Sequence, residues 1–407
     1  MSEKEFKVYS YRWVVLGVFM LVNFAIQVLW ICFAPITGPA AAYYAVSDLQ
    51  IGFLAMSFMI IYVPLSIPVS WVIDTIGYRK SVSIGAVIMG VFGVLRGIFA
   101  ANYIVVVIST IGLAIAQPFL MNAVTTVAAK WFPLKERATA SGLGIVANFL
   151  GIAAGMVLSP MLFLNFGLQN MLLIYGIFAV FTTIVFIIFT REAPATPPCA
   201  PGGETRALVL DGLKRMLKMK DIWILMVLFL VGMGVFNGIS TWIEGIVRPR
   251  GFSISQAGDF GGALLFGGIL GAILIPIISD KLQKRKIFLL AGVALCIPGL
   301  IGIIYASSYW FVMLSMFFFG FFLMSLAPVG YQYAAEITYP APEGTSNGLL
   351  NLAGQASVVF IYGMEAFKNA DGSFTTSLLV LSFLLAVCVV LILWLKESSL
   401  MKTVKKA

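Results

Sequence analysis

Long apolar blocks recur along this chain, and they constrain its fold more than any other feature. Each block is about 20 residues long, and about 20 helical residues cross the hydrocarbon core of a bilayer. The whole chain is 61% hydrophobic and 11% charged, with a mean hydropathy of +1.02. A soluble domain is about half apolar and about a quarter charged. Because water does not solvate so much apolar surface, we expect an integral membrane protein.

The continuity of these blocks favours helices. A membrane β-barrel would instead show weak alternation within segments of about ten residues. The sequence therefore predicts an all-α membrane protein with twelve spans. The predicted spans are residues 12–37, 50–73, 81–100, 103–129, 138–165, 170–190, 221–247, 254–279, 287–306, 308–335, 345–367 and 374–395.

Positive charges are distributed unevenly between the connections. The chain has 26 Lys and Arg against 17 Asp and Glu, a formal net charge of +9. Almost all the positive residues lie in the two tails and in the connections after every second span. The exceptions are Arg96, inside a span, and Arg248, Arg250 and Lys368 on the opposite side. This bias predicts a multi-pass protein of the cytoplasmic (plasma or cell inner) membrane with both termini cytoplasmic, and it argues against a nucleic-acid partner.

Residue types that carry catalysis or bind metals are scarce. The chain has 0 His and 4 Cys. Cys32, Cys296 and Cys388 lie in predicted spans and Cys199 lies in a loop, without the spacing of a disulfide or metal site. The chain also lacks the glycine-rich phosphate loop of an ATPase. We therefore expect no enzyme activity, no cofactor and no metal site.

The two halves of the chain resemble each other. The stretch DTIGYRK (74–80) and the stretch DKLQKRK (280–286) both begin with Asp and end in a basic pair. Likewise, WFPLKERATASG (131–142) and TYPAPEGTSNG (338–348) share a Pro and a Glu at matching positions. Both pairs are separated by nearly the same length of chain. The sequence thus predicts a duplicated six-helix half, an arrangement typical of transporters whose substrate site lies between the halves near the midplane.

A Pro- and Gly-rich stretch, REAPATPPCAPGGE, separates the halves. Beyond it, Leu210, Leu213 and Leu217 share one face of a basic amphipathic helix, which either lies on the membrane surface or is solvated. The predicted domains are an N-terminal bundle at 1–190, a cytoplasmic linker at 191–220, a C-terminal bundle at 221–395 and a cytoplasmic tail at 396–407.

Polar side chains occur at helical spacing inside several predicted spans. At bilayer depth such side chains face the bundle interior or a water-filled cavity. Counting along each helix places Gln117, Asn237 and Gln355 near mid-bilayer. The candidate substrate-binding residues are Asn23, Gln27, Trp30, Gln117, Asn237, Tyr331, Asn351 and Gln355. The alternative for each amide is a purely structural hydrogen bond between helices, and for Trp30 it is packing.

Three further features of the spans carry predictions. Tyr62, Ser66 and Ser70 form another polar stripe, in span 2. Glu244, predicted on the same face of span 7 as Asn237, is a possible proton or cation site. Arg96 lies near the outer end of span 3, where we expect its long side chain to snorkel to the interface rather than to bind an anion.

The Asp…Arg-Lys stretches resemble the loop signature of the major facilitator superfamily. In that family the acidic residue and the basic pair lock helices together on the cytoplasmic side in one conformation. The resemblance implies the superfamily's fold, two pseudo-symmetric bundles of six helices. It also implies a gating role for Asp74, Arg79, Lys80, Asp280, Arg285 and Lys286. The alternative for these residues is the capping of helix ends.

Further stretches resemble one branch of that superfamily, the feline leukaemia virus subgroup C receptor-related transporters. The matching stretches are YRWVVLGVFMLVN, YVPLSIPVSWVIDTIG, AIAQPF, WFPLKERATA and EITYPAPEGTSNGLLNLAGQ. Members of the branch are linked to choline and ethanolamine transport and to haem export. The family's choline site implies roles for Trp30, Gln117 and Gln355, which match it. Its helix 7 Tyr is Asn237 here, which removes one wall of a cation–π cage.

Together these features predict a monomeric secondary or facilitative transporter in the lipid bilayer. It would move a small polar organic solute, first a choline- or ethanolamine-like amine, by alternating access. Trp30 would stack on the cationic or apolar part of the solute, and Gln117 and Gln355 would hydrogen-bond a hydroxyl, with Asn237 nearby. The alternatives are a proton-coupled transporter of haem, a vitamin-like solute or a carboxylate, and a non-transporting receptor on the same fold. Proton coupling would involve Glu244, and haem ligation would have to use Met, Tyr or Cys.

Overall fold

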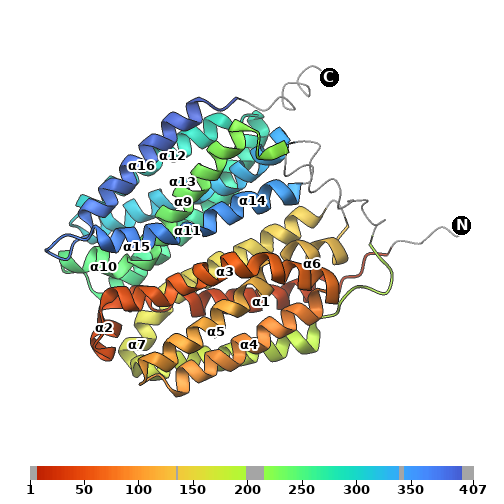
Figure 1. Ribbon diagram of the computed structural model, residues 1–407, viewed down its shortest axis with the longest axis horizontal. Coiled ribbons are helices and arrows are strands. Elements are labelled where there is room, and N and C mark those ends of the chain that lie inside the picture. Colours follow the sequence, from red (N-terminus) through yellow and green to blue (C-terminus); the bar gives the residue numbers. More distant parts are fainter. Residues whose placement is uncertain (1–6, 134–135, 199–214, 339–342, 397–407) are drawn as a thin grey trace, which may run out of the picture. The chain divides into compact units, whose positions relative to one another are not determined.

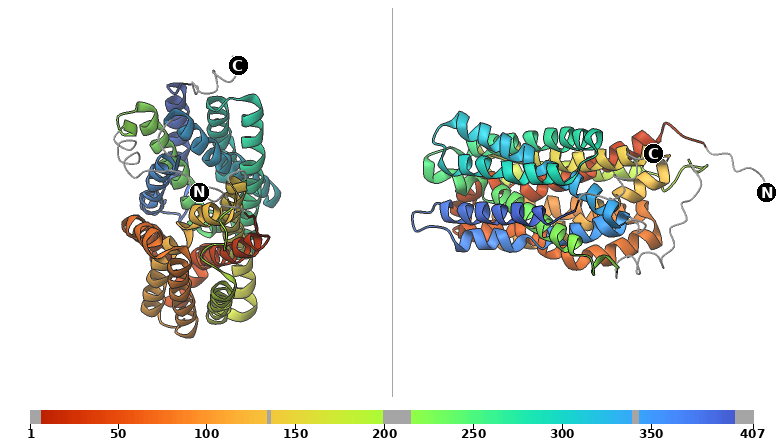
Figure 2. Two further views of the ribbon diagram at one scale, coloured as in Figure 1. Left: turned by 90° about the vertical axis from the view of Figure 1, so that its right-hand side faces the viewer. Right: turned by 90° about the horizontal axis from the view of Figure 1, so that it is seen from above.

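The computed structural model describes residues 7–133, 136–198, 215–338 and 343–396, without the side chains of 138 and 343–345. The chain divides into two compact units, residues 1–202 and 203–407, and the division falls within the predicted linker. In each unit the long helices lie alongside one another as a bundle (Figure 1 and Figure 2). Most of the amphipathic helix predicted in the linker lies outside the described residues.

The first unit begins with a helix that is interrupted and then resumes. Its elements are α1 (Arg12–Ile31), η1 (Ala34–Ile36), α2 (Thr37–Tyr44), α3 (Asp48–Ile76), α4 (Tyr78–Ile98), α5 (Tyr103–Met121), α6 (Val124–Trp131) and α7 (Arg137–Phe189). The 53 residues of α7 contain two predicted spans, which meet at Gly167 with φ +76°. Glycine adopts this left-handed conformation without the steric penalty of a Cβ.

The second unit shows similar interruptions. Its elements are α9 (Lys220–Thr241), α10 (Ile243–Val247), η3 (Arg248–Arg250), α11 (Ile254–Leu282), α12 (Lys286–Tyr305), α13 (Tyr309–Thr338), α14 (Glu343–Gln355), α15 (Val358–Ala366) and α16 (Thr375–Leu393). The predicted span at 345–367 is therefore two helices, α14 and α15, that meet in a turn at Ala356 and Ser357.

Within the described residues, 10 helices are long and apolar enough to cross a membrane. One of these is the long helix with two spans on either side of Gly167. Another predicted span is divided between α14 and α15, and each of these is shorter than a full span. The prediction of an all-helical membrane protein with twelve spans is confirmed, and only the continuity of the spans differs.

Glycines allow helices within each unit to approach closely. At Gly151 of α7 a Cβ would overlap the carbonyl oxygen of Phe24 in α1. At Gly271 of α11 a Cβ would overlap the carbonyl oxygen of Phe321 in α13. Helix pairs in membranes depend on such van der Waals contact, because lipid offers no hydrophobic drive for their association. Large apolar side chains such as Trp310 and Ile67 are exposed, as expected for surfaces in contact with lipid.

Several candidate substrate-binding residues lie at or near the ends of the interrupted helices. Trp30 is the last residue but one of α1, and Gln355 is the last residue of α14. Gln117 and Asn237 each lie four residues before the end of their helices, α5 and α9. A turn within a membrane span loosens the regular backbone hydrogen bonding, and such turns often mark functional hinges.

Candidate substrate-binding site

The predicted polar stripe of α1 is buried, and part of it connects helices of the first unit. The Gln27 Nε2 atom donates to Oδ1 of Asn148 in α7 at 3.2 Å. The indole Nε1–H of Trp30 donates to the carbonyl oxygen of Ala55 in α3 at 3.1 Å. Gln27 and Trp30 therefore hold α1 against its neighbours. Sequence analysis missed Asn148, whose amide stands alone in span 5 without a stripe to mark it.

Two other candidate amides of the first unit have polar atoms without partners. Asn23 donates through Nδ2 to the carbonyl oxygen of Phe19 at 3.0 Å, while its Oδ1 is buried without a hydrogen bond to any described residue. Gln117 is 7% exposed, and its amide forms no hydrogen bond within the described part of the chain. A fully buried acceptor without a partner costs about 1–3 kcal/mol, and Asn23 Oδ1 is such an atom. The polar atoms of Gln117 are not fully buried, so they are available to a polar ligand.

The polar stripe of span 2 has a structural explanation. Asn122, in the turn between α5 and α6, accepts a hydrogen bond from the Tyr62 hydroxyl at 2.5 Å. Its Nδ2 donates to the carbonyl oxygen of Ser66 at 3.1 Å and to Oγ of Ser70 at 3.1 Å. One amide thus binds three turns of α3, a helix that contains two prolines. This network fixes α3 to α5 by hydrogen bonds between helices.

The candidate residues of the second unit meet near the turn between α14 and α15. Asn237 of α9 is buried, and its Nδ2 donates to Oγ of Ser357 in that turn at 3.1 Å. Gln355, at the end of α14, is half-buried and forms no side-chain hydrogen bond among the described residues. The hydroxyl of Tyr331 in α13 donates to Oδ1 of Asn351 at 2.9 Å. Ser357 was missed because a lone Ser in an apolar span carries no distinct signal.

Additional polar atoms follow Asn237 on α9. The hydroxyls of Ser240 and Thr241 are buried and lack hydrogen-bond partners within the described residues. The ring of Tyr331 packs against Phe229 of α9, with 4.8 Å between ring centroids. The end of α9 therefore offers a ligand two hydroxyls as well as an amide.

Glu244 does not continue the face of Asn237, which corrects the predicted stripe. Helix α9 ends at Thr241, and Trp242 forms a turn with φ −98° and ψ 18° before α10 begins. Glu244 lies in α10, is 3% exposed, and has a carboxylate oxygen 3.6 Å from Nη1 of Arg248. Its role as a proton or cation site stays a prediction.

The prediction that Arg96 snorkels to the interface is wrong. The side chain is 0% exposed, and its Nη1 donates to the carbonyl oxygen of Leu29 at 3.0 Å. Its Nη2 lies 3.5 Å from Sγ of Cys32. The interruption of α1 provides these acceptors beside α4, so the guanidinium reaches polar partners inside the bundle.

The second copy of the charged loop forms a bonded network. Arg285 is buried and pairs with Asp280 at 2.5 Å and with Glu336 of α13 at 2.9 Å. The Lys286 Nζ donates to the carbonyl oxygen of Leu393 in α16 at 2.7 Å. The connection between α11 and α12 is thereby tied to two other helices of its unit.

The first copy of the loop has a different arrangement. The side chains of Asp74, Arg79 and Lys80 are exposed and form no ion pair with the residues that the structure describes. Instead, the backbone N–H of Arg79 donates to the carboxylate of Glu192 at 2.8 Å, and Lys130 pairs with the same carboxylate. Gly77, with φ +89°, lies next to this carboxylate, and a Cβ on Gly77 would be 2.5 Å from Oε1 of Glu192.

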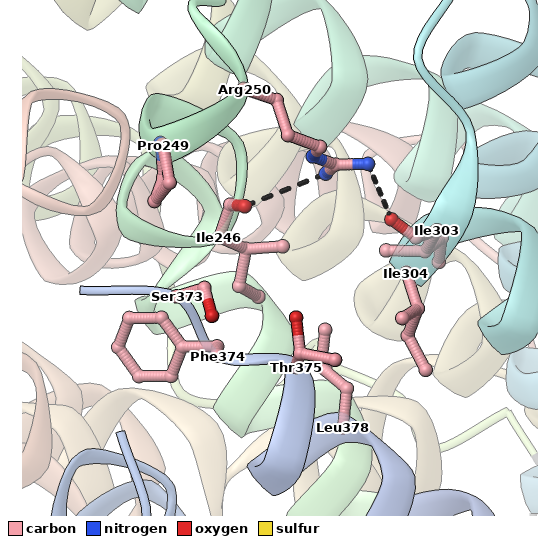
Figure 3. Close-up of a pocket in the computed structure, with 9 residues that line it drawn as sticks. All are labelled: Ile246, Pro249, Arg250, Ile303, Ile304, Ser373, Phe374, Thr375 and Leu378. Carbon is pink, nitrogen blue, oxygen red and sulfur yellow. Dashed lines mark hydrogen bonds between the residues drawn. The ribbon is translucent and has the colours of Figure 1, made fainter. Parts of the chain in front are cut away.

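A small pocket of about 40 Å³ lies in the second unit, between α10, the end of α12 and the start of α16. Figure 3 shows Arg250 over it, donating to the carbonyl oxygens of Ile246 and Ile303. Burial lowers the pKa of the Arg250 guanidinium. The pocket has room for a few waters, and no candidate substrate-binding residue lines it.

Comparison with known proteins identifies the family. The family model "Major Facilitator Superfamily" matches residues 19–360 and 243–406. The chain belongs to the Major Facilitator Superfamily. This transporter family is not enzymatic, so the predictions of the family, of a transporter and of no enzyme activity are confirmed.

Curated relatives place this Major Facilitator Superfamily transporter more narrowly. It is 33% identical over 388 residues to Solute carrier family 49 member A3 of Danio rerio, covering 91% of this chain and 81% of the relative. It is 30% identical over 403 residues to the Choline/ethanolamine transporter FLVCR1 of Mus musculus, covering 90% and 70%. The predicted resemblance to the feline leukaemia virus receptor-related branch is confirmed at this level.

A solved structure supports the fold of this Major Facilitator Superfamily member. A bacterial homolog of the human lysosomal transporter Spinster, in an inward-facing, unoccupied conformation, aligns with a TM-score of 0.74 at 16% identity. The alignment covers 95% of this chain and 97% of that one. At this identity the likeness establishes the fold alone.

Proposed function

We propose that this transporter moves a small organic amine of the choline or ethanolamine type across the cytoplasmic membrane by alternating access. The observation that carries the proposal is that two side-chain amides lack hydrogen-bond partners among the described residues. Gln117 and Gln355 are the members of the predicted substrate-binding set whose side chains form no hydrogen bond with other described residues. Because their hydrogen-bonding groups are not used by the described parts of their units, they can bind the hydroxyl of a solute.

Trp30 supports the cationic part of the proposal. Its indole N–H is already bonded to Ala55, so the ring face is what it offers a ligand. A cation over the face of Trp is attracted by about 0.5–2 kcal/mol, with the higher value for a desolvated site. Choline carries a quaternary ammonium and a hydroxyl, which match the ring face of Trp30 and the free amides. Relatives named as choline/ethanolamine transporters support the same class.

The charged loops support a gating role in alternating access. In the second unit, Arg285 bridges Asp280 and Glu336 and so holds α11 and α12 to α13. In the first unit the corresponding side chains are exposed and without ion pairs among the described residues. Ion pairs that form in one state and open in another bias a conformational equilibrium.

We infer that the transporter works as a monomer with both termini in the cytoplasm.

The test is uptake of labelled choline and ethanolamine into proteoliposomes without an imposed ion gradient. We expect saturable uptake by the wild type, and a half-saturation concentration raised about two- to tenfold in Gln117→Ala and Gln355→Ala, which each lose one hydrogen bond to the solute. Gln169→Ala is the matched control, because Gln169 is exposed on α7 and forms no side-chain hydrogen bond among the described residues. Absence of saturable uptake of both amines by folded, reconstituted protein would contradict the proposal.

A further inference from the structure

A buried arginine from another helix holds the end of α1 where Trp30 lies. Arg96 of α4 is 0% exposed. Its Nη1 donates to the carbonyl oxygen of Leu29 at 3.0 Å, and its Nη2 is 3.5 Å from Sγ of Cys32. The centre of its guanidinium is 5.7 Å from the centre of the Phe33 ring. All three contacts are with residues that flank Trp30 in sequence.

These contacts compensate part of the cost of a buried cation, and Nε of Arg96 is buried without a hydrogen bond to a described residue. No Asp or Glu pairs with Arg96 among the described residues, and a buried charge without compensation is strongly unfavourable. The last carbonyl groups of a helix lack helical donors and carry a partial negative charge. Arg96 therefore caps α1 where the chain leaves the helix, and the helix end takes the place of a carboxylate.

Trp30 is held from two sides as a result. The backbone carbonyl of Leu29, the preceding residue, is bonded to α4 through Arg96. The indole N–H of Trp30 is bonded to α3 through the carbonyl oxygen of Ala55. With the backbone and the ring edge both fixed, the orientation of the ring face is fixed as well.

We propose that Arg96 is a positioning residue that acts through Trp30. By capping the interrupted end of α1, it holds the indole ring at the angle at which that ring meets the solute. The role of Trp30 in solute binding rests on the proposed function above, whereas the capping of α1 does not.

The second unit contains a matched control. Arg250 caps a helix end in the same manner, donating to the carbonyl oxygen of Ile303 at 2.7 Å (Figure 3). It also donates to the carbonyl oxygen of Ala306 at 2.8 Å, at the end of α12. No candidate substrate-binding residue adjoins those carbonyls in the sequence. Arg250→Gln therefore removes a cap of the same chemistry without disturbing a substrate-binding residue.

The transport experiment separates positioning from folding. We expect Arg96→Gln to raise the half-saturation concentration for choline about fivefold or more, the scale of a lost cation–π contact, with a smaller change in maximal rate. Arg96→Lys keeps the charge without the fork that reaches two acceptors, so it should recover part of the loss. Arg250→Gln should leave the half-saturation concentration unchanged. In a Trp30→Ala background, Arg96→Gln should add little, as expected of coupled residues.

Hydrogen–deuterium exchange provides a readout that needs no substrate. We expect Arg96→Gln to accelerate amide exchange between residues 30 and 36 and to leave α9 unaffected. Unchanged amide exchange in this segment would overturn the proposal. An equal rise in the half-saturation concentration from Arg96→Gln with and without Trp30 would also overturn it. If Arg96→Gln does not fold, Arg96→Lys serves in both assays. If the wild type transports neither amine, the proposed function fails while the exchange data still decide the positioning role.

Discussion

At the scale of single residues, the polar side chains of the spans divide into two groups. Asn122, Gln27 and Asn237 use their amides for hydrogen bonds within their own unit. Gln117 and Gln355 form no such bond with a residue that the structure describes. The first group contributes to stability, because each amide satisfies a buried partner. The second group adds no such bond among the described residues and leaves capacity for a ligand.

This division predicts opposite effects for two neighbouring amides of the first unit. Asn122→Ala leaves the Tyr62 hydroxyl without its acceptor and should lower the free energy of unfolding by about 1–3 kcal/mol. Gln117→Leu removes an unsatisfied amide and should leave stability unchanged or slightly higher. Thermal unfolding in detergent measures both. Equal destabilisation by the two substitutions would contradict the division.

At the scale of elements, turns and close approaches determine where helices end. The connection between α3 and α4 requires Gly77 for its positive φ of +89°. Gly17 in α1 is the opposite case, since a Cβ there has nothing within 4 Å. Glycine is therefore required for the backbone conformation at Gly77, whereas the space around Gly17 would accept a side chain.

Alanine substitutions should show this difference. Gly77→Ala forces a side chain into a left-handed conformation and displaces the flexible Glu192 carboxylate, so it should destabilise the protein by about 1–3 kcal/mol, mainly through φ. Gly17→Ala should stabilise it by about 0.5–1 kcal/mol, because Ala is the better helix former. The midpoints of thermal unfolding of the two variants should lie on opposite sides of the wild type. A stabilising Gly77→Ala would show that the connection tolerates a side chain.

The sequence predicts the helices better than their interruptions. A membrane span needs about 20 apolar residues, which is readable from composition alone. The turn after Met121 has a local signal in Pro118, but the turn at Trp242 has no Gly or Pro beside it. That turn depends on tertiary contacts, among them the bond from the Trp242 indole to the carbonyl oxygen of Ile361.

Predictions for the site show the same limit. Periodicity identified which polar residues lie at bilayer depth, because helical spacing is local. It did not distinguish Gln27, which is bonded to Asn148, from Gln117, which has no partner among the described residues. That difference depends on a helix far away in the sequence. The snorkelling prediction for Arg96 was wrong for the same reason, since the acceptors belong to α1.

At the scale of the whole molecule, the duplicated halves carry the same motif in different bonded states. Arg285 is 2% exposed and joins two carboxylates, whereas Arg79 is exposed. The Glu336 carboxylate is buried beside Arg285. Removing the Arg285 cation would leave this buried carboxylate unpaired, which is strongly destabilising. The side chains of the second copy therefore contribute to stability in this conformation, whereas those of the first copy form no ion pair with a described residue.

Substitutions at the two arginines should reveal this asymmetry. Arg285→Gln should lower the free energy of unfolding by about 3–5 kcal/mol, the effect of breaking a buried ion pair. Adding Glu336→Gln should restore part of the loss, because the unpaired charge is removed. Arg79→Gln should leave unfolding unchanged. A full loss in the double variant would show that geometry, rather than charge, links α12 to α13.

The placement of positive charge predicts the topology of the whole chain. Tags fused to the N- and C-termini should be cleaved by protease added to the cytoplasmic side only. A cysteine introduced at exposed Pro249 should react with an impermeant thiol reagent from the opposite side. Labelling of both regions from one side would contradict the predicted orientation.

The buried cap on α1 also constrains how the chain is made. An arginine on a lone helix costs about 2.5–3.5 kcal/mol at the bilayer centre on insertion scales and less toward a helix end, where Arg96 lies in the last turn of α4. Synthesis proceeds from the N-terminus, so α1 and its carbonyl acceptors are already in the membrane when α4 leaves the ribosome. The guanidinium of α4 therefore meets its acceptors only once α4 packs against α1, and a nascent chain with a damaged α1 leaves that charge without them.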